Sequence, residues 1–276
     1  MTKTCCVMVV KNEDELLEPW LLYHSFMFGH ENIFVFDNGS TSEKVRFILE
    51  HYAALGVSVD YSKNSLEHYK SRSLWLGDFF RELGDRGYDF LFPLDCDEFL
   101  ALHDIERVIQ CDKALILQEL DGLLDKHAVF KADFSYPNLL GSPGVYLGWA
   151  QKKHFFSKHS FGSTDHGFHN IVARDHAPFV ETRFCYIHYH YKPFDTMVAH
   201  SREKLAMDYD VSQLENVPSN NRLGQFLHME ADNYREFVAN FRDHKKYTAP
   251  GLQTVLADGG LRLPFEFCQP LEGTHA

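Results

Sequence analysis

Apolar runs alternate with helix-like segments through the first hundred residues, and this alternation constrains the fold more than any other feature. The apolar runs cover residues 5–10, 33–36, 57–59 and 90–94. Between them, segments with helical spacing or helix signals cover residues 17–28, 40–56 and 66–83. Strands that alternate with helices form a parallel sheet whose faces are covered by the crossover helices. The pattern therefore predicts an α/β fold.

Local signals predict where some of these elements begin and end. Gly29 is expected to end the first helix. Ser40 and Glu43 fit a capping box at the start of the second helical segment. Pro93 cannot donate to a sheet ladder, so it predicts an edge, a bulge or a strand end, with a local break just before Asp95.

The rest of the chain gives weaker signals. A hydrophobic content of 45% is ample for one large domain with an appendage. We expect a catalytic domain over residues 1–200 and a helical extension over 201–276 packed on it. The finer expectations are a helix, a turn-rich segment, a histidine-rich segment, two charged helices and an irregular tail, at residues 114–124, 135–148, 149–192, 201–209, 233–247 and from 248 onward.

Charge and cysteine usage exclude some classes of partner. The net charge is −12, without a basic stripe, which argues against binding a nucleic acid polymer or docking on anionic lipid. The six cysteines form no C-x-x-C pair, which indicates a reducing compartment. The apolar stretch near the amino end is too short for a signal peptide or a membrane span. We therefore expect a cytoplasmic protein without a transmembrane segment, with peripheral attachment to an inner membrane left open.

Polar residues follow each predicted strand, at the edge where ligands bind in parallel sheets. They are Lys11-Asn12-Glu13, Asp37-Asn38, Asp60 and Asp95-Cys96-Asp97. Asp95 and Asp97 form a D-x-D pair, which suits Mg²⁺ or Mn²⁺ and leaves positions open for diphosphate oxygens. The residues alone leave two alternatives, a solvated loop or the amino end of a helix favoured by Asp97 and Glu98.

Two stretches together resemble a known family. They are "VMVVKNEDELLEPWLLYHSFMFGHENIFVFDNGSTS" and "YDFLFPLDCDEFL", at residues 7–42 and 88–100. They are similar to the glycosyltransferase family 2-like enzymes, in the branch that shades into family 92-type transferases. Pro19, between Glu18 and Trp20, departs from that pattern. The resemblance covers roughly residues 5–205, and it implies the GT-A nucleotide-diphospho-sugar transferase fold, a Rossmann-like mixed sheet flanked by helices.

The resemblance also implies roles for individual residues. Lys11, Asn12 and Glu13 would line the nucleotide, with Glu13 on ribose hydroxyls. Asp37 would contact the base, with Asn38 beside it, although Asp37-Asn38-Gly39 is by itself a turn signal. Asp95 would face ribose or a metal-bound water, Asp97 would ligate the metal, and Glu98 would hold the loop or the acceptor. Lys70 and Arg72 suit phosphate or, equally, a solvated helix face.

The histidine-rich segment supplies the other predicted metal ligands. "YIHYHYKPFD" resembles a late H-Y-x-x-K-S segment of the same branch, with Pro193 in place of the serine. On that match His188 completes the metal site, with His190 as second choice, and Lys192 binds diphosphate. Alternating His and Tyr also fits an ordinary half-exposed strand.

A second segment in this region suggests a general base. "FGSTDH" resembles an F-G-S-S-G-H segment near the acceptor, with Asp165 in place of glycine. Asp165 and His166 are therefore the predicted catalytic bases, ahead of Asp175 and Glu181. An inverting transferase needs such a group to take the proton of the acceptor hydroxyl.

Together these observations predict a metal-dependent glycosyltransferase of the hexosyltransferase type. The expected donor is a UDP-sugar, the acceptor is a hydroxyl of a glycan, glycolipid or other molecule, and inversion is expected. A role in polysaccharide or lipopolysaccharide assembly would suit it. Two alternatives stay open, namely a metal-dependent hydrolase that uses the histidines, and a non-catalytic protein that binds nucleotide-sugars.

Overall fold

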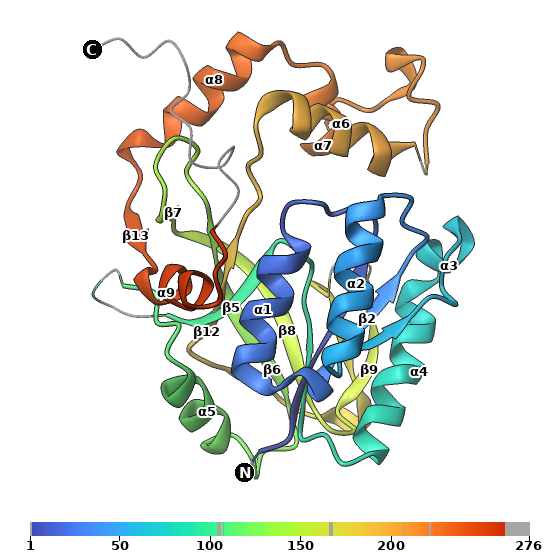
Figure 1. Ribbon diagram of the computed structural model, residues 1–276, viewed down its shortest axis with the longest axis vertical. Helices are drawn as coiled ribbons and strands as arrows, with labels where there is room; N and C mark the ends of the chain where they lie inside the picture. The colour runs from blue at the N-terminus through green and yellow to red at the C-terminus, as the bar shows by residue number, and fades with distance from the viewer. Residues whose placement is uncertain are drawn as a thin grey trace.

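The computed structural model describes residues 2–262, apart from residues 104, 105, 107, 166, 167, 207 and 221. Within these residues the chain forms a nine-stranded mixed sheet with helices on both faces (Figure 1). The strand order is β3-β2-β1-β4-β8-β6-β12-β5, and β11 pairs with β6 outside this path. The N-terminal half of the chain supplies a parallel part of the sheet, and later segments extend it with strands of both directions.

The parallel part has the four strands that the sequence predicted. β1 pairs with β2 and β4, and β2 pairs with β3, always in parallel. The predicted α/β class is thus confirmed, as a Rossmann-like mixed sheet flanked by helices, the arrangement that the resemblance to GT-A enzymes implied. The bounds are β1 Thr4–Val10, α1 Leu17–Phe28, β2 Ile33–Asp37, α2 Glu43–Leu55, β3 Ser58–Asp60, α3 Leu66–Lys70, α4 Arg72–Asp85 and β4 Phe90–Pro93.

Three local predictions in this half meet different outcomes. Gly29 does end α1, at a φ of 91° that favours glycine. Ser42 caps α2 by accepting from the Val45 N–H, so the predicted cap at Ser40 is wrong. The predicted helix over residues 66–83 is two helices, because Ser71 leaves helical geometry, and both its N–H and its hydroxyl donate to the Glu67 carbonyl.

Pro93 ends β4, as predicted. β4 lies between β1 and β8, but β8 pairs only with Phe90 and Leu91, so Pro93 leaves no ladder bond unmade on that side. On the other side the Leu94 N–H donates to the Val7 carbonyl at 3.1 Å. The chain therefore leaves the sheet at this point and enters residues 94–97, the acidic loop, which carries Asp95 and Asp97.

The second half of the chain completes the sheet and adds the covering helices. β5 Glu98–Leu102, β6 Val129–Pro137, β8 Trp149–Ser157 and β12 Phe184–His188 join the main sheet. The remaining elements are η1 His30–Asn32, α5 Lys113–Asp121, β7 Val145–Leu147, β9 Phe161–Thr164, β10 Ile171–Ala173, η2 Arg174–His176, β11 Phe179–Glu181, α6 Phe194–Leu205, η3 Leu214–Asn216, α7 Arg222–Leu227, α8 Ala231–Ala239, η4 Asn240–Asp243, β13 Lys246–Thr248 and α9 Pro250–Asp258.

Some C-terminal elements differ from prediction. The helix expected at residues 201–209 is α6, which begins earlier, and the one expected at 233–247 ends as α8 before β13. The segment from 248 onward is not irregular, because Pro250 opens α9. α9 buries Leu252 and Leu256 in the same core as β1 and α1.

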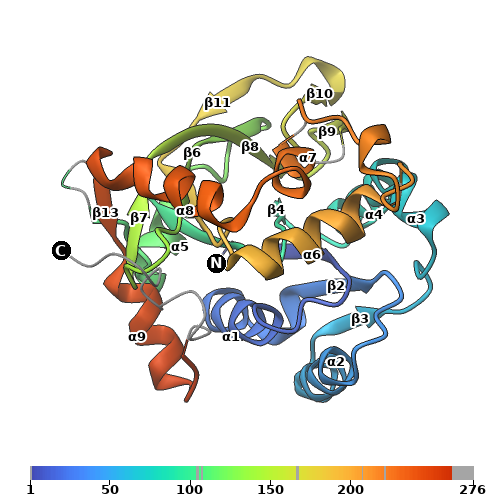
Figure 2. The same cartoon turned by 90° about the horizontal axis from the view of Figure 1, so that it is seen from above.

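Helices α6, α7 and α8 lie at the end of the sheet toward which β1 and β2 point, and α6 crosses above the sheet (Figure 2). A separate apolar cluster that includes Tyr191, Phe226 and Tyr234 anchors these helices. No helix in the described part of the chain is both long and apolar enough to span a bilayer.

Candidate active site

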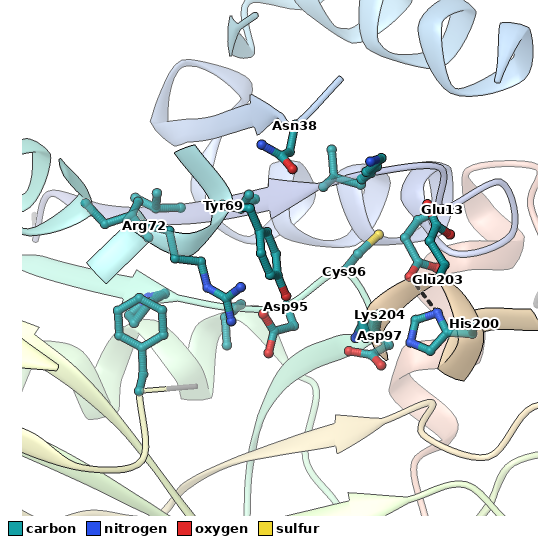
Figure 3. A pocket seen from close by; sticks show the side chains of 18 of the residues that line it. Glu13, Asn38, Tyr69, Arg72, Asp95, Cys96, Asp97, His200, Glu203 and Lys204 are labelled. Carbon is teal, nitrogen blue, oxygen red and sulfur yellow. Dashed lines mark ion pairs between the residues drawn. The ribbon is translucent and has the colours of Figure 1, made fainter. Parts of the chain in front are cut away.

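A pocket lies beyond the carboxyl ends of β1, β2 and β4, with α6 on its far side (Figure 3). This is the position where parallel sheets bind ligands. Its polar and charged walls come from the strand ends, the α3–α4 junction and α6. They are Lys11, Glu13, Asn38, Tyr69, Arg72, Asp95, Cys96, Asp97, His200, Glu203 and Lys204. Six predicted site residues are thus brought together here: Lys11, Glu13, Asn38, Arg72, Asp95 and Asp97.

Two hydrogen bonds hold the acidic loop that follows β4. The Glu98 carboxylate accepts from the Asp95 backbone N–H at 2.9 Å. The Asp97 carbonyl accepts from the Tyr189 N–H at 2.8 Å. Glu98 therefore holds the loop, one of the two roles that the sequence left open for it.

Asp95 and Glu98 share an internal cation. The Lys153 ammonium, on β8, lies 3.0 Å from Asp95 and also contacts Glu98. The Lys153 side chain is 2% exposed, whereas that of Asp95 is 60% exposed. Burial in the pocket acts to raise the pKa of Asp95, but Lys153 and Lys204 together outweigh it and the pKa is lowered. Asp95 therefore keeps a negative charge that faces the pocket.

Asp97 faces His188 at the end of β12. Its carboxylate is 3.4 Å from His188 Nε2, and His188 Nδ1 is 3.4 Å from the Ser135 hydroxyl. Burial acts to raise the pKa of Asp97, but the imidazole, together with Lys204 and Lys192, outweighs it and holds the pKa well below its ordinary value. The converse holds for His188, because burial lowers its pKa but Asp97 outweighs it, so the pKa is raised.

This pair suits a divalent cation. Two ligands at right angles, each about 2.1 Å from one octahedral ion, are about 3 Å apart, close to the separation of Asp97 and His188. Ser135 behind His188 can fix the orientation of the ring, as outer partners of metal-bound histidines do.

The predicted set of four metal ligands is not assembled. Across the described residues, no three His, Cys, Asp or Glu side chains converge as a group that could hold a metal ion. Asp95 is engaged by Lys153, and the His190 ring stands 5.0 Å from that of His188, beyond the end of β12. Only Asp97 and His188 remain as a pair.

Glu13, at the amino-terminal side of α1, links three elements. The Lys192 ammonium is 3.2 Å from one of its oxygens, and His200 Nδ1 is 3.8 Å from the other. Burial raises the pKa of Glu13 despite Lys192. Burial lowers the pKa of His200 to about 3, so this imidazole is neutral near pH 7. Lys192, predicted to bind diphosphate, thus holds Glu13 and does not line the pocket.

Two predicted nucleotide contacts stabilise turns. The Asn12 side chain accepts from the Thr41 and Ser42 N–H groups, and the Asp37 carboxylate accepts from the Ser40 N–H at 3.1 Å. Neither residue lines the pocket. Asn38 does line it, while its amide donates to the carbonyls of Lys63 and Ser65.

The predicted bases lie apart from these groups. Asp165 follows β9, accepts from the His169 N–H and the Asn170 amide, and does not line the pocket. Burial acts to raise the pKa of Asp165, but these hydrogen bonds outweigh it and the pKa is lowered. His166 lies outside the described residues. The alternatives Asp175 and Glu181 form ion pairs with Arg174 and Lys131.

Sequence reasoning missed Lys153, Tyr69 and the three residues of α6 that line the pocket. Nothing in the sequence marks Lys153, because its partners are 55 and 58 positions away. The spacing of His200 and Lys204 is helical, so a helix over them would have placed both on one face. The expected helix began one residue too late to include His200.

No family model matches the chain, and no curated protein is similar to it at a significant level. Solved structures are similar to it at low identity. S. aureus TarS 1–349 is 11% identical over 76% of this chain and 68% of that chain, with a TM-score of 0.38. Against a longer TarS structure, this chain covers 41% of that chain.

A second similar structure is glucosyl-3-phosphoglycerate synthase from Mycobacterium tuberculosis in complex with phosphoglyceric acid. It is 18% identical over 75% of this chain and 78% of that chain, with a TM-score of 0.38. The same enzyme with Mn²⁺, UDP-glucose and phosphoglyceric acid has a TM-score of 0.29 over 50% of this chain and 44% of that chain.

Proposed function

We propose that the chain is a metal-dependent GT-A glycosyltransferase that moves a sugar from a UDP-sugar to a hydroxyl acceptor. One observation carries the proposal: Asp97, on the wall of a pocket at the carboxyl ends of parallel strands, lies 3.4 Å from His188. The strand order β3-β2-β1-β4 and the sequence resemblance support it. Its place in polysaccharide or lipopolysaccharide assembly, in the cytoplasm, stays a prediction.

Asp97 and His188 are the residues that would hold Mn²⁺ or Mg²⁺. A cation there would act as a Lewis acid toward the diphosphate. Asp95, held by Lys153, presents a fixed carboxylate that can accept from ribose hydroxyls. Glu13, held by Lys192, offers a second such acceptor in the same pocket.

Transfer by inversion needs one displacement. The acceptor oxygen bonds to the anomeric carbon while the bond from that carbon to the diphosphate breaks, and its electron pair stays on UDP. The acceptor proton passes to a base. Asp165 and His166 stay the predicted bases, although Asp165 is hydrogen-bonded within its own turn.

A hydrolase is the alternative function, because Ser135 contacts His188 and His188 contacts Asp97, as in a Ser-His-Asp catalytic triad. Ser135 is 1% exposed, so its hydroxyl cannot reach a substrate. The trio therefore supports metal binding better than nucleophilic catalysis.

Thermal-shift measurements against UDP, GDP, CMP and their sugars, with and without Mn²⁺, test the proposal. We expect the largest rise in Tm with UDP-sugars and Mn²⁺ together. Stabilisation by another nucleotide, and none by UDP-sugars, would contradict the donor assignment. Slow release of UDP from the donor with Mn²⁺ would separate a transferase from a protein that only binds nucleotide-sugars.

A further inference from the structure

Helix α6 presents one face to the pocket, opposite the acidic loop. His200, Glu203 and Lys204 line the pocket from this face, three and four residues apart. In Figure 3, Lys204 lies beside Asp97, at the end of the pocket away from Arg72. A cation on α6 thus approaches the acidic loop from a different part of the chain.

Three other cations near the pocket are engaged by protein groups, whereas Lys11, exposed after β1, also lines the pocket. Lys153 lies between Asp95 and Glu98, and Lys192 lies against Glu13. The Arg72 guanidinium stacks over the Tyr69 ring, 4.1 Å from its centre. Lys204 is exposed, and within the described part of the chain it forms no ion pair with a carboxylate.

The positive charge of Lys204 interacts with both aspartates of the acidic loop. After the stronger effects of burial and of their direct partners, Lys204 contributes to lowering the pKa of both Asp95 and Asp97. An ammonium beside Asp97 would also lie beside a diphosphate held on a cation at Asp97 and His188. Ammonium groups bind phosphate oxygens as point charges, with up to three donors.

We propose that Lys204 binds the diphosphate of the donor and stabilises the negative charge that the leaving group gains. This inference rests on the proposed function and assigns to α6 the role that the resemblance implied for Lys192. As the bond between the anomeric carbon and the diphosphate oxygen breaks, its electron pair stays on that oxygen. Lys204 would then donate hydrogen bonds to the departing group.

Calorimetric titration of UDP and of uridine in the presence of Mn²⁺ tests this role. We expect Lys204→Gln to weaken UDP binding roughly tenfold or more and to leave uridine binding unchanged. Lys204→Arg, which keeps the charge, should recover most of the loss. Arg202→Gln is the matched control, since Arg202 is exposed on α6 but does not line the pocket.

Each other outcome has a definite meaning. UDP affinity of Lys204→Gln equal to that of the wild type overturns the inference, and so does an equal weakening of UDP and uridine. Failure of the wild-type chain to bind UDP with Mn²⁺ overturns the proposed function itself. The Tm of the ligand-free Lys204→Gln variant should equal that of the wild type, because the Lys204 side chain is exposed.

Discussion

At the scale of single residues, Asp95 and Asp97 differ in role although they are two positions apart. Asp95 forms an ion pair with the buried ammonium of Lys153, whereas Asp97 contacts the imidazole of His188, which can also bind a metal. The place of the D-x-D pair at the ligand-binding edge of the sheet could be predicted from the sequence, because both carboxylates follow a buried strand. The partner of Asp95 could not, because Lys153 arrives from β8 through tertiary pairing, and His188 was expected beside the pair only from the resemblance.

Asp97→Asn should reduce kcat/KM by roughly 100-fold or more, since it removes a charged metal ligand. It should also weaken Mn²⁺ binding, which calorimetry without a donor would measure. Asp232→Ala is the control, because Asp232 is highly exposed and pairs only locally with Arg235 among the described residues. Near-normal Mn²⁺ affinity in Asp97→Asn would remove the metal role.

Lys153→Met should lower the free energy of unfolding by roughly 3–5 kcal/mol, because it leaves the buried Glu98 carboxylate without its countercharge. Urea unfolding would measure this loss, and adding Glu98→Gln should restore part of it. Lys152→Met, at the exposed neighbouring position, should change stability by about 0.5 kcal/mol or less. Equal effects at the two lysines would show that the ion pairs contribute nothing.

At the scale of elements, α1 is tied to the sheet by a buried histidine. His24 Nδ1 donates to the Trp20 carbonyl at 3.0 Å, and Nε2 accepts from the Leu100 N–H at 3.3 Å. Both bonds require a neutral imidazole with its proton on Nδ1. The link of His24 to β5 could not be predicted from the sequence, because it depends on a strand 76 residues away.

This histidine predicts a loss of stability in acid. Burial lowers the pKa of His24 to about 3 in the folded chain, against about 6.5 when unfolded. Between these values only the unfolded state binds the proton, so stability falls as the pH drops below about 6.5 and is unaffected above it. From pH 7 to pH 5 the wild type should lose about 2 kcal/mol more than His24→Gln.

Denaturant unfolding at the two pH values measures that difference. His51→Gln, at an exposed position on α2, should keep the acid dependence of the wild type. If His24→Gln loses as much stability in acid as the wild type, His24 is not responsible.

At the scale of the whole molecule, the parallel half could be predicted and the second half could not. Crossover connections make successive strands parallel, so the parallel pairing of β1 to β4 follows from the alternation of elements, whereas their order came only from the structure. β5 pairs with β12, and β4 with β8, across long separations instead, and β8 carries a register shift against β6. Turn-rich sequence such as residues 135–148 gives no sign of those partners.

The predicted boundary at residue 200 stays a prediction, but the contacts across it indicate one cooperative unit. α9 packs on α1, and β13 pairs with β7. Limited proteolysis of the full chain should therefore yield no stable fragment of residues 1–200. Accumulation of such a fragment with native circular dichroism would show an independent domain.

The short link between β12 and α6 has a thermodynamic consequence. His188 ends β12 and Phe194 begins α6, so only residues 189–193 separate the imidazole from the helix that bears Lys204. Any shift of that helix on donor arrival would be transmitted to the imidazole. By thermodynamic reciprocity, binding of the metal at Asp97 and His188 would then change the affinity for the nucleotide at Lys204, and the reverse, by the same factor. Metal and nucleotide would therefore bind cooperatively.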